Sequence, residues 1–496
     1  MKNSTKKAIV IGSGVAGMVC AVRLQSADFQ VIVIEKNEYF GGKLHQFNLE
    51  DYRFDAGPSL FTMPQYFEQL ATDVGLDIND FLKFRPLNIV CKYFWEDGTQ
   101  LNAFANIDDY ANEVANKLGH NDQGLKQALG NAAAKYELTG TTFIEKPLNS
   151  AKTWLNWSVA KALLNLPKLN VFSSMNQVHE STLKHPKLVQ LFNRYATYNG
   201  SSPYKAPGIL SMIPHLEQHF GAYMPEGGIH DLAKALYAMC LAKGVTFRFN
   251  TAAKKIVLTE KKQLQGIVLE NNEYLECPLV ISNLDAWFTY HKLLADKPQL
   301  APQRILNQER SSSALIFYWG IDRAFEALDV HNIFFSEDYK AEFQHLFDLK
   351  ALYHDPTVYL HISSKMVKTD APQGHENWFV MINVPANPHI NWAEEAEKAK
   401  ELIIKKINKI LNLDIRPHIR QQEVLSPDKI QSKTGSYLGS LYGSSSNNPY
   451  AAFLRHPSQS KIKGLYLCGG STHPGGGIPL CMMSGKLTAQ SILEEG

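Results

Sequence analysis

The chain has almost no net charge. Its 496 residues include 50 Lys and Arg against 48 Asp and Glu, which leaves a formal charge of +2 at pH 7. Proteins that bind nucleic acid usually present a strong positive field. The charge balance therefore argues against nucleic acid as a partner.

Cysteine is scarce and scattered. No two cysteines form a CxxC pair, and the chain is far longer than the small secreted domains that disulfides hold together. We therefore expect a reducing, cytoplasmic compartment. The six cysteines stand at positions 20, 91, 240, 277, 468 and 481.

Long apolar runs are missing as well. No stretch of about eighteen consecutive apolar residues occurs, so we expect no membrane-spanning helix. Lys6 and Lys7, followed by a long uncharged stretch, resemble the start of a signal peptide. Gly12, Gly14 and Gly17 interrupt that stretch and favour a strand, a turn and a helix instead.

The chain is too long for one ordinary core, and at 45% apolar residues too apolar for a disordered tether, so we expect two or three domains. The sequence opens as a βαβ unit, with a buried strand at residues 8–11, a helix at 17–25 and a second buried strand at 31–34. Residues 245–281 break into short apolar runs that predict a small β-meander.

The second half of the chain predicts another sheet. Residues 314–319 are apolar on both faces, as in a central strand, while 357–366 and 378–384 alternate with period two. Together they indicate one antiparallel sheet. A helix with its apolar face between positions 396 and 410 is expected to cover this sheet and to end before Pro417.

A GxGxxG turn follows the first strand. Gly12 permits the turn, Gly14 lets the backbone approach a pyrophosphate, and Gly17 lets the helix pack on the strand. Glu35 closes the next strand, where its carboxylate can accept hydrogen bonds from an adenosine ribose. With the positive end of the helix dipole, this arrangement predicts a dinucleotide site for NAD or FAD.

The chain closes on a second glycine-rich turn. A buried strand at residues 465–468 runs into GGSTHPGGGIP, residues 469–479, and then into a final helix. A glycine-rich turn at a helix N-terminus is a second place for an anion or a dipole.

Several motifs together resemble the carotenoid desaturase family of flavoproteins. They are GSGVAG, EKNEYFGGK and FDAGPSL near the N-terminus, MPEGGIHDLAKAL and ISNLD in the centre, and GSLYG and LYLCGGSTHPGGGIP near the C-terminus. The similarity covers essentially the whole chain, and within the family it is greatest to bacterial 1-hydroxycarotenoid 3,4-desaturases.

The resemblance implies FAD bound in an extended form. The first glycine turn would hold the pyrophosphate, Glu35 the ribose and the backbone at Ala253 the adenine, while the last glycine turn would approach the flavin. The final helix would stabilise the negative charge of reduced flavin. The implied cofactor residues are Gly12, Gly14, Ala16, Gly17, Glu35, Lys36, Gly42, Lys43, Pro58, Ser59, Ala253, Gly469, Gly470, Ile478 and Pro479.

The implied fold class is α/β, with a Rossmann-like FAD-binding domain assembled from separated segments. An α+β substrate domain, an antiparallel sheet with helices, is inserted between them, and a helical region faces a membrane. The predicted boundaries are 1–75, 222–290 and 450–496 for the FAD domain, 76–100 and 291–449 for the substrate domain, and 101–221 for the helical region.

The implied activity is FAD-dependent desaturation of a carotenoid at the 3,4 bond of a 1-hydroxylated acyclic end group. Because that bond is allylic to a polyene and has no adjacent carbonyl, we expect hydride loss to flavin to come first. A phytoene-type desaturase or a carotenoid isomerase is the alternative within the family. A flavin amine or porphyrinogen oxidase and a non-catalytic isoprenoid escort are less favoured, since an escort needs no pyrophosphate cradle.

A carotenoid substrate implies a membrane partner. A molecule of on the order of forty carbons is too apolar to cross water, so we expect capture from a bilayer and an apolar tunnel to the flavin. From Lys146 to His179 there is no Asp or Glu, and lysines alternate with Trp154, Trp157 and several leucines. This composition is typical of a segment at a membrane interface, although a basic helix packed on its own domain is nearly as plausible.

Two groups of histidines have ordinary explanations. His215 and His219 have the spacing of zinc ligands, but Pro214 precedes them and no third ligand is evident, so we favour packing and predict no metal. His473 is interpreted as a turn histidine bonded to the backbone rather than as an acid or base.

The sulfur atoms near the last glycine turn are interpreted in the same way. Cys468 and Cys481 flank that turn, and small buried residues are favoured over a redox pair. Met482 and Met483 are expected in the core rather than against the cofactor.

Overall fold

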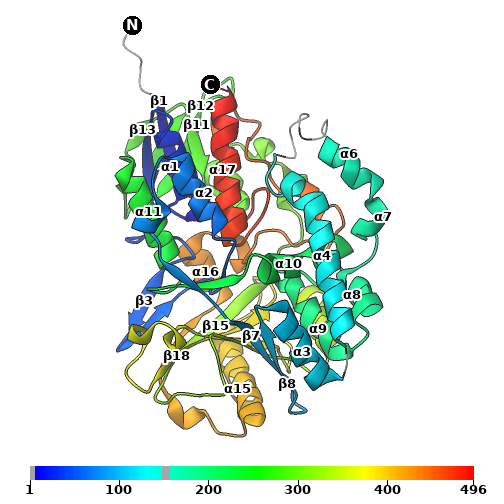
Figure 1. The fold of residues 1–496 in the computed structure, drawn as a ribbon. Coiled ribbons are helices and arrows are strands. Elements are labelled where there is room, and N and C mark those ends of the chain that lie inside the picture. The colour runs from blue at the N-terminus through cyan, green and yellow to red at the C-terminus, as the bar shows by residue number, and fades with distance from the viewer. Residues whose placement is uncertain (1–5, 120, 148–152, 154–156, 496) are drawn as a thin grey trace.

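The computed structural model describes residues 6–119, 121–147, 153 and 157–495. Within them, a parallel sheet lies at the end of the molecule that carries both chain ends, and a larger sheet lies at the opposite end (Figure 1). The chain passes between these two ends several times, so each sheet is built from segments that are far apart in the sequence.

The parallel sheet has five strands in the order β10-β2-β1-β14-β20. Alternate residues of its central strand enter two different cores, Ala8 and Val10 on one side and Ile9 and Ile11 on the other. A parallel sheet that is apolar on both faces must be covered on both. The strands are β1 (Lys6–Ile11), β2 (Phe29–Ile34), β10 (Thr246–Arg248), β14 (Val280–Ser282) and β20 (Leu465–Leu467).

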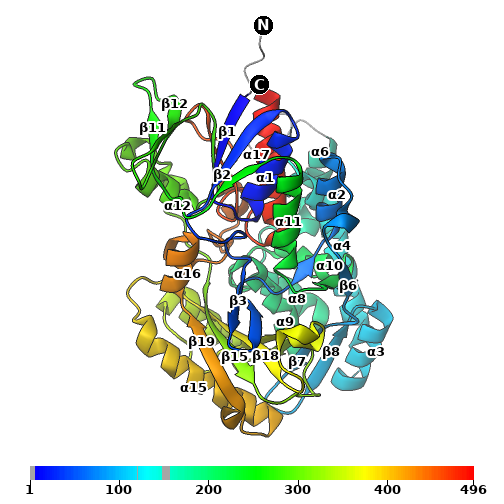
Figure 2. The same cartoon turned by 90° about the vertical axis from the view of Figure 1, so that its left-hand side faces the viewer.

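Three helices cover one face of this sheet and a meander covers the other (Figure 2). The predicted meander is present, with its three strands antiparallel. The helices are α1 (Val15–Gln25), α11 (Asp231–Ala242) and α17 (Ile478–Glu495), and the meander strands are β11 (Ala253–Leu258), β12 (Leu264–Leu269) and β13 (Tyr274–Glu276).

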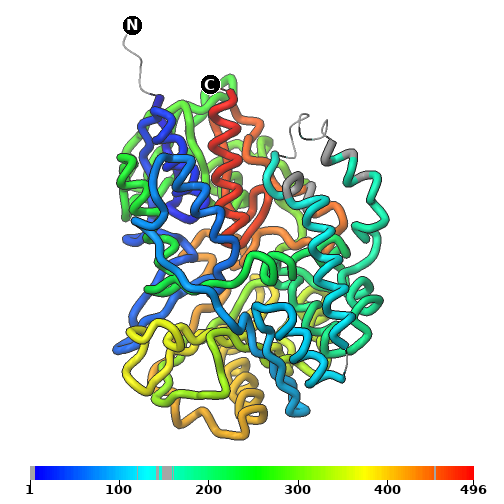
Figure 3. Tube along the Cα trace, in the orientation of Figure 1, coloured from blue at the N-terminus to red at the C-terminus, as the bar shows by residue number. Residues whose placement is uncertain are grey.

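The first and last helices lie side by side, as the blue and red tubes of Figure 3 show. Gly485 of α17 permits this contact, because a Cβ at that position would lie 2.5 Å from the Ala16 carbonyl oxygen of α1. The two ends of the chain therefore complete one layer. The predicted start of α1 at residue 17 was two residues late, since Gly14 already forms the N-cap.

The larger sheet has seven strands in the order β19-β15-β18-β17-β16-β7-β8. The three strands predicted from the sequence, β15, β17 and β18, pair antiparallel as expected. The pair β7 and β16 is parallel, however, so the complete sheet is mixed rather than antiparallel. The strands are β7 (Ile89–Phe94), β8 (Gln100–Phe104), β15 (Ser313–Ile321), β16 (His331–Phe334), β17 (Val358–Ile362), β18 (Glu376–Val384) and β19 (Ile419–Leu425).

The helix α15 (Trp392–Leu411) packs one apolar stripe on this sheet, as predicted, and ends before Pro417. The strand predicted at residues 357–366 was too long. It stops at Ile362 because Ser363 bonds to the Asp370 carboxylate and the backbone of Ser364 bonds to Asn377. The predicted domain boundaries remain predictions, and the strand β8 crosses the one drawn at residue 100.

Most of the remaining helices form a third region beside the two sheets (Figure 1). None of the helices in the described ranges combines the length and the apolarity that crossing a bilayer requires. This region contains α3 (Ile107–Leu118), α4 (Asp122–Phe143), α6 (Trp157–Leu164), α7 (Leu166–Leu169), α8 (Met175–Leu183), α9 (Pro186–Asn193) and α10 (Ile213–Gln218).

Short elements connect the three regions. The strands β3 and β4 form a hairpin that reaches from the parallel sheet to the larger one. These elements are β3 (Gln46–Leu49), β4 (Tyr52–Asp55), β5 (Phe61–Thr62), α2 (Gln65–Asp73), β6 (Phe84–Pro86), β9 (Ala222–Pro225), α12 (Ala286–Phe288), α13 (Gln303–Leu306), α14 (Tyr339–Gln344) and α16 (Pro427–Thr434).

Candidate active site

A cavity of about 480 Å³ lies between the two sheets. One part is lined by the glycine turns of the parallel sheet, and the other by side chains of the seven-stranded sheet and of the helical region. This volume is in the range of sites for small organic ligands. The cavity therefore joins the predicted dinucleotide site to a second, more apolar space.

The first glycine turn forms a narrow cradle at the start of α1. Gly12 has a φ of +97°, which glycine adopts without strain. A Cβ on Gly14 would lie 2.6 Å from the Asn283 amide nitrogen, and one on Gly42 would lie 3.4 Å from the Gly14 Cα atom. The bare backbone leaves the helix N-terminus open to the cavity, as a pyrophosphate requires.

Glu35 lies at the end of β2, beside this cradle. One carboxylate oxygen accepts hydrogen bonds from the Ser13 backbone and hydroxyl, both at 2.9 Å, and the other accepts from the Asn37 backbone and side-chain amides at 3.0 and 2.9 Å. The carboxylate is therefore held in a fixed place at the cavity wall. Lys36 also lines the wall, and its ammonium group donates to the Ser432 carbonyl.

A second helix N-terminus meets the same cavity. Gly476 and Gly477 precede α17, and with Ile478 and Pro479 they line the wall. The first turns of both α1 and α17 lack acidic residues, so nothing there offsets the positive end of either dipole. Two such ends favour a ligand that carries negative charge at two places. A redox dinucleotide has one such charge on its pyrophosphate and gains the other on its ring system when it is reduced.

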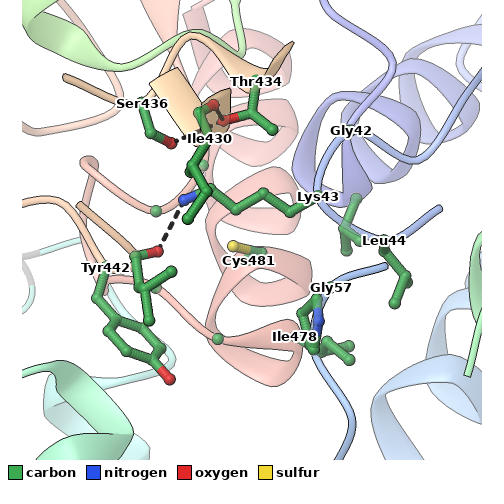
Figure 4. A pocket seen from close by; sticks show the side chains of 18 of the residues that line it. Gly42, Lys43, Leu44, Gly57, Ile430, Thr434, Ser436, Tyr442, Ile478 and Cys481 are labelled. Atoms are coloured by element: carbon green, nitrogen blue, oxygen red, sulfur yellow. Dashed lines mark hydrogen bonds between the residues drawn. The ribbon is translucent and has the colours of Figure 1, made fainter. Parts of the chain in front are cut away.

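Lys43 brings a positive charge between these two helix ends. Its side chain extends from the Gly42 turn toward the Tyr442 loop, with Cys481 of α17 beside it (Figure 4). The ammonium group donates to the Leu441 carbonyl at 2.8 Å and to the Ser440 carbonyl at 3.2 Å. Burial lowers the pKa of Lys43 to about 8, so an anionic ligand would stabilise its charged form.

The cavity brings together all of the cofactor residues implied by the sequence except Gly17. Gly17 faces the strand instead, where a Cβ would collide with the Gly12 carbonyl oxygen. It serves the close contact of helix and strand that the motif also requires.

Sequence reasoning missed part of the wall. Asn283 and Asp285 lie in the motif ISNLD, directly after β14, and both line the cavity together with Tyr442. Because the carboxyl ends of parallel strands share one edge, their position after a buried strand was the signal that could have found them. Asp285 also forms an ion pair with Arg310.

The methionines and histidines singled out in the sequence do not line the cavity. Met482 and Met483 are buried in the core, as predicted, and His473 bonds to the Lys146 carbonyl at 3.0 Å, again as predicted. The His215 and His219 rings stack on each other 4.5 Å apart. In the described part of the chain, no three His, Cys, Asp or Glu side chains are grouped as metal ligands would be.

All six cysteines are free. Cys481 lines the cavity, whereas Cys468 is buried beneath the turn. Burial raises the pKa of Cys481 to about 11, so it is a neutral thiol near pH 7. This state fits the prediction of small buried residues rather than a redox pair.

The apolar part of the cavity has the seven-stranded sheet as its floor. The register of the strands aligns one row of side chains across six of them, and all but the first line the cavity. At about 4.8 Å between strands, this row is roughly 24 Å wide. Its members, in order, are Tyr93, Ile333, Tyr359, Met381, Ile316 and Leu425.

A buried ion pair closes the Tyr93 side of this floor. Arg194 donates to both Glu217 oxygens at 2.9 and 3.3 Å and to the Tyr93 hydroxyl at 2.8 Å. Tyr195 and Tyr198 donate their hydroxyl hydrogens to the same carboxylate. Because the charges and their hydrogen-bonding groups are paired with one another, the cluster forms a neutral wall.

The chain matches a known family along nearly its whole length. Residues 15–493 match the flavin containing amine oxidoreductases. A 1-hydroxycarotenoid 3,4-desaturase from a Flavobacterium sp. is 48% identical over 491 residues, which are 98% of this chain and 99% of that protein. A 4,4'-diapolycopene oxygenase from a Methylomonas sp. is 30% identical over 503 residues, which are 99% of each protein.

Solved structures share the fold at low sequence identity. An oxidoreductase from Methanosarcina mazei superposes with a TM-score of 0.62 at 14% identity and covers 98% of this chain and 100% of its own. Putrescine oxidase bound to putrescine gives a TM-score of 0.62 at 12% identity over 99% of both chains. The glycine cradle leaves the backbone open, as the flavin cofactor of the matched family requires. The chain therefore belongs to the flavin-containing oxidoreductases, within them to the carotenoid desaturases, and its cofactor is FAD.

Proposed function

We propose that the protein desaturates the 3,4 bond of an acyclic carotenoid end group that carries a 1-hydroxyl. The observation that carries the proposal is the 48% identity, over 98% of the chain, to a protein named for this reaction. The named oxygenases at 30% identity are more distant than that relative. The cavity supports the proposal, because it leads from the cofactor cradle to an apolar floor.

In this proposal one part of the cavity holds the cofactor and the other holds the substrate. Bound FAD supplies a two-electron acceptor. The floor residues Ile333, Met381 and Ile316 offer apolar surface to a polyene and exclude water from it. Loss of a hydride from one carbon to the flavin, and of a proton from its neighbour to a base or to water, would form the double bond. Hydride loss would come first, because the cation that it leaves is delocalised over the polyene.

The proposal is tested by mixing oxidised holoprotein with a 1-hydroxylated acyclic carotenoid in liposomes without oxygen. We expect the flavin absorbance to bleach and a red-shifted carotenoid, lighter by two hydrogens, to appear. Mass spectrometry separates the alternatives. A product that has gained oxygen under aerobic conditions would point to an oxygenase, and an isomer of unchanged mass to an isomerase.

We further propose that the protein attaches to the cytoplasmic face of a membrane. Its six free cysteines suit a reducing compartment. Phe172, Leu164 and Leu166 are 87%, 77% and 37% exposed, and Lys161 and Lys168 lie beside them. These residues belong to α6, α7 and the turn after them, at the outer edge of the helical region (Figure 1). Trp154, which the sequence placed in this surface, lies outside the described residues.

Flotation with anionic liposomes tests this attachment. At about 1 kcal/mol for each lysine near such a surface, the charges alone give a weak hold, so the apolar side chains must contribute. Replacing Phe172 and Leu164 by Ser should lower the floated fraction severalfold. The matched control is Leu349→Ser, because Leu349 is 64% exposed on another element. Equal flotation of the two variants would contradict the proposal.

A further inference from the structure

A chain of hydrogen bonds leads from the cofactor turn into the floor of the cavity. Ser59 belongs to the turn implied to line the path toward the flavin, and its hydroxyl bonds to the Tyr359 hydroxyl at 2.7 Å. The same hydroxyl bonds to His331 Nδ1 at 2.8 Å. All three residues line the cavity. The Ser59–Tyr359–His331 chain therefore fixes the imidazole beside the predicted reaction site.

The other ring nitrogen of this histidine has no partner. His331 is only 3% exposed, and Nε2 makes no hydrogen bond within the protein. The described residues contain several buried side-chain atoms without a partner. Of the residues that carry these atoms, only His331 lines the cavity. Buried polar atoms in proteins are almost always bonded, because leaving one unpaired is unfavourable. An unpartnered polar atom on a residue that lines a cavity is one that a ligand group can satisfy.

The ring is neutral, and the His361 ring that stacks on it also has an Nε2 without a partner, but His361 does not line the cavity. Burial holds the pKa of His331 well below its usual value, and the stacked His361 ring, 4.9 Å away, adds to this effect. Arg194 and Glu217, farther along the same wall, are bonded to each other and to tyrosines. Each nitrogen of a neutral imidazole can form one hydrogen bond with a hydroxyl group, either as donor or as acceptor.

From this geometry we infer that His331 binds the 1-hydroxyl of the carotenoid and so selects hydroxylated end groups. The inference rests on the proposed function, which places that hydroxyl on the carbon two bonds from the reacting 3,4 bond. An acyclic hydroxylated carotenoid has no other polar atom at that end, and the adjoining floor residues Ile333 and Phe379 match its apolar part. A substrate without the hydroxyl would leave Nε2 unpaired, and sites of this kind reject such analogues strongly. His331 is thus a residue that determines specificity.

The test compares two acyclic carotenoids in liposomes, one with the 1-hydroxyl and one without it. For each, turnover by the holoprotein and equilibrium binding, followed by the shift of carotenoid absorbance, are measured. The wild-type protein should prefer the hydroxylated carotenoid in both measurements. His331→Leu should reduce this preference by about tenfold, the usual effect of one lost hydrogen bond. His331→Gln, which keeps a polar atom near Nε2, should retain most of it.

Two further variants keep the result interpretable. Phe379→Leu alters the apolar floor, so it should weaken the binding of both carotenoids equally and leave the preference for the hydroxylated one unchanged. His331→Phe can still stack on His361, and it should lose the preference even if the leucine variant fails to hold FAD. An unchanged preference in the leucine or phenylalanine variant would overturn the inference.

The measurements separate this inference from the proposed function. A wild-type protein that binds the hydroxylated carotenoid more tightly but does not convert it would refute the proposed reaction, and loss of that tighter binding in His331→Leu would still support the inference. A wild-type protein that converts and binds both carotenoids equally would be a desaturase without the hydroxyl site, which overturns the inference.

Discussion

At the scale of single residues, the clearest requirement of the site is a missing side chain. A Cβ on Gly14 would enter the cradle and lie 2.6 Å from Asn283. We expect Gly14→Val to purify without FAD, because its side chain takes the space of the pyrophosphate. The flavin absorbance per protein measures this.

A second glycine provides the control. Gly130 lies in the exposed middle of α4, where a Cβ would meet nothing within 4 Å. Gly130→Ala should therefore retain FAD and raise the free energy of unfolding by about 0.4–1 kcal/mol. Retention of stoichiometric FAD in the Gly14 variant would contradict the assignment of the cradle.

Lys43 makes cofactor binding depend on pH. Its pKa is about 8 in the free protein because of burial, and a bound anion raises that pKa. Affinity for FAD should therefore be full below about pH 8 and fall as the pH rises above it, by at most about tenfold per unit. Titrations of flavin fluorescence between about pH 7 and about pH 9.5 measure this slope.

The matched variants for this prediction keep or remove the positive charge. Lys43→Arg keeps a cation throughout this range, so it should bind FAD without the pH dependence. Lys43→Met should bind weakly at every pH. A wild-type affinity that rises with pH would mean that the charge of Lys43 does not act on the cofactor.

At the scale of elements, one carboxylate joins the β3–β4 hairpin to the start of α11, a helix that covers the parallel sheet. Asp55, at the end of β4, accepts hydrogen bonds from the Ile229 and His230 backbones, both at 2.9 Å, just before α11. It also pairs with Arg53 at 2.7 Å, and Arg53 reaches Asp370 at 3.1 Å. Three segments that are distant in the sequence thus meet at one buried group.

Removing this carboxylate should destabilise the protein. Asp55→Ala leaves Arg53 with one carboxylate partner and two backbone amides unpaired, so we expect the free energy of unfolding to fall by about 3 kcal/mol. Thermal unfolding of the holoprotein measures the change as a lower Tm. Glu394→Ala, which breaks an exposed pair on α15, is the control and should leave the Tm nearly unchanged.

The elements themselves were largely predictable, because their signals are local. The strands β1 and β2, the helix α15 and the final strand and helix follow from apolar periodicity and from turn residues. The end of β17 was not predictable in this way, since the bonds of Ser363 and Ser364 reach Asp370 and Asn377. The alternation of apolar and polar residues in the sequence continues past Ile362, so it does not indicate that the strand ends there.

The site was predictable where a motif stands for a backbone shape, and not where it depends on the register of distant strands. The glycine turns and Glu35 belong to the first kind. His331 and Tyr359 meet only because β16 and β17 pair in one register, and Tyr442 reaches the cavity from a loop with no periodic pattern. No local feature of the sequence points to these contacts.

At the scale of the whole molecule, the cofactor should act as a clamp. The cavity wall takes residues from the first strands, from the meander and from the last glycine turn, so bound FAD would contact segments from the start, middle and end of the chain. At about one hundred times its Kd, FAD should add about 2.7 kcal/mol to the free energy of unfolding.

Thermal unfolding at increasing FAD concentration checks this prediction. We expect the Tm to rise steadily with FAD. Riboflavin at the same concentrations should raise it less, because it lacks the phosphates and the adenosine that the glycine cradle and Glu35 would hold. A Tm that does not depend on FAD would show that the clamp contributes nothing to stability.

The contact of the first and last helices also means that this layer of the protein cannot be completed until synthesis ends. The strand β1 and the helix α1 leave the ribosome early, but α17, which packs on α1, and β20, the last strand of the same sheet, are made some 450 residues later. At about 5–20 residues per second, the delay is on the order of a minute. During that time the apolar surface that α17 will cover, including the helix face around Ala16, is exposed to the cell. We therefore expect newly made chains to need a chaperone there until the final helix arrives.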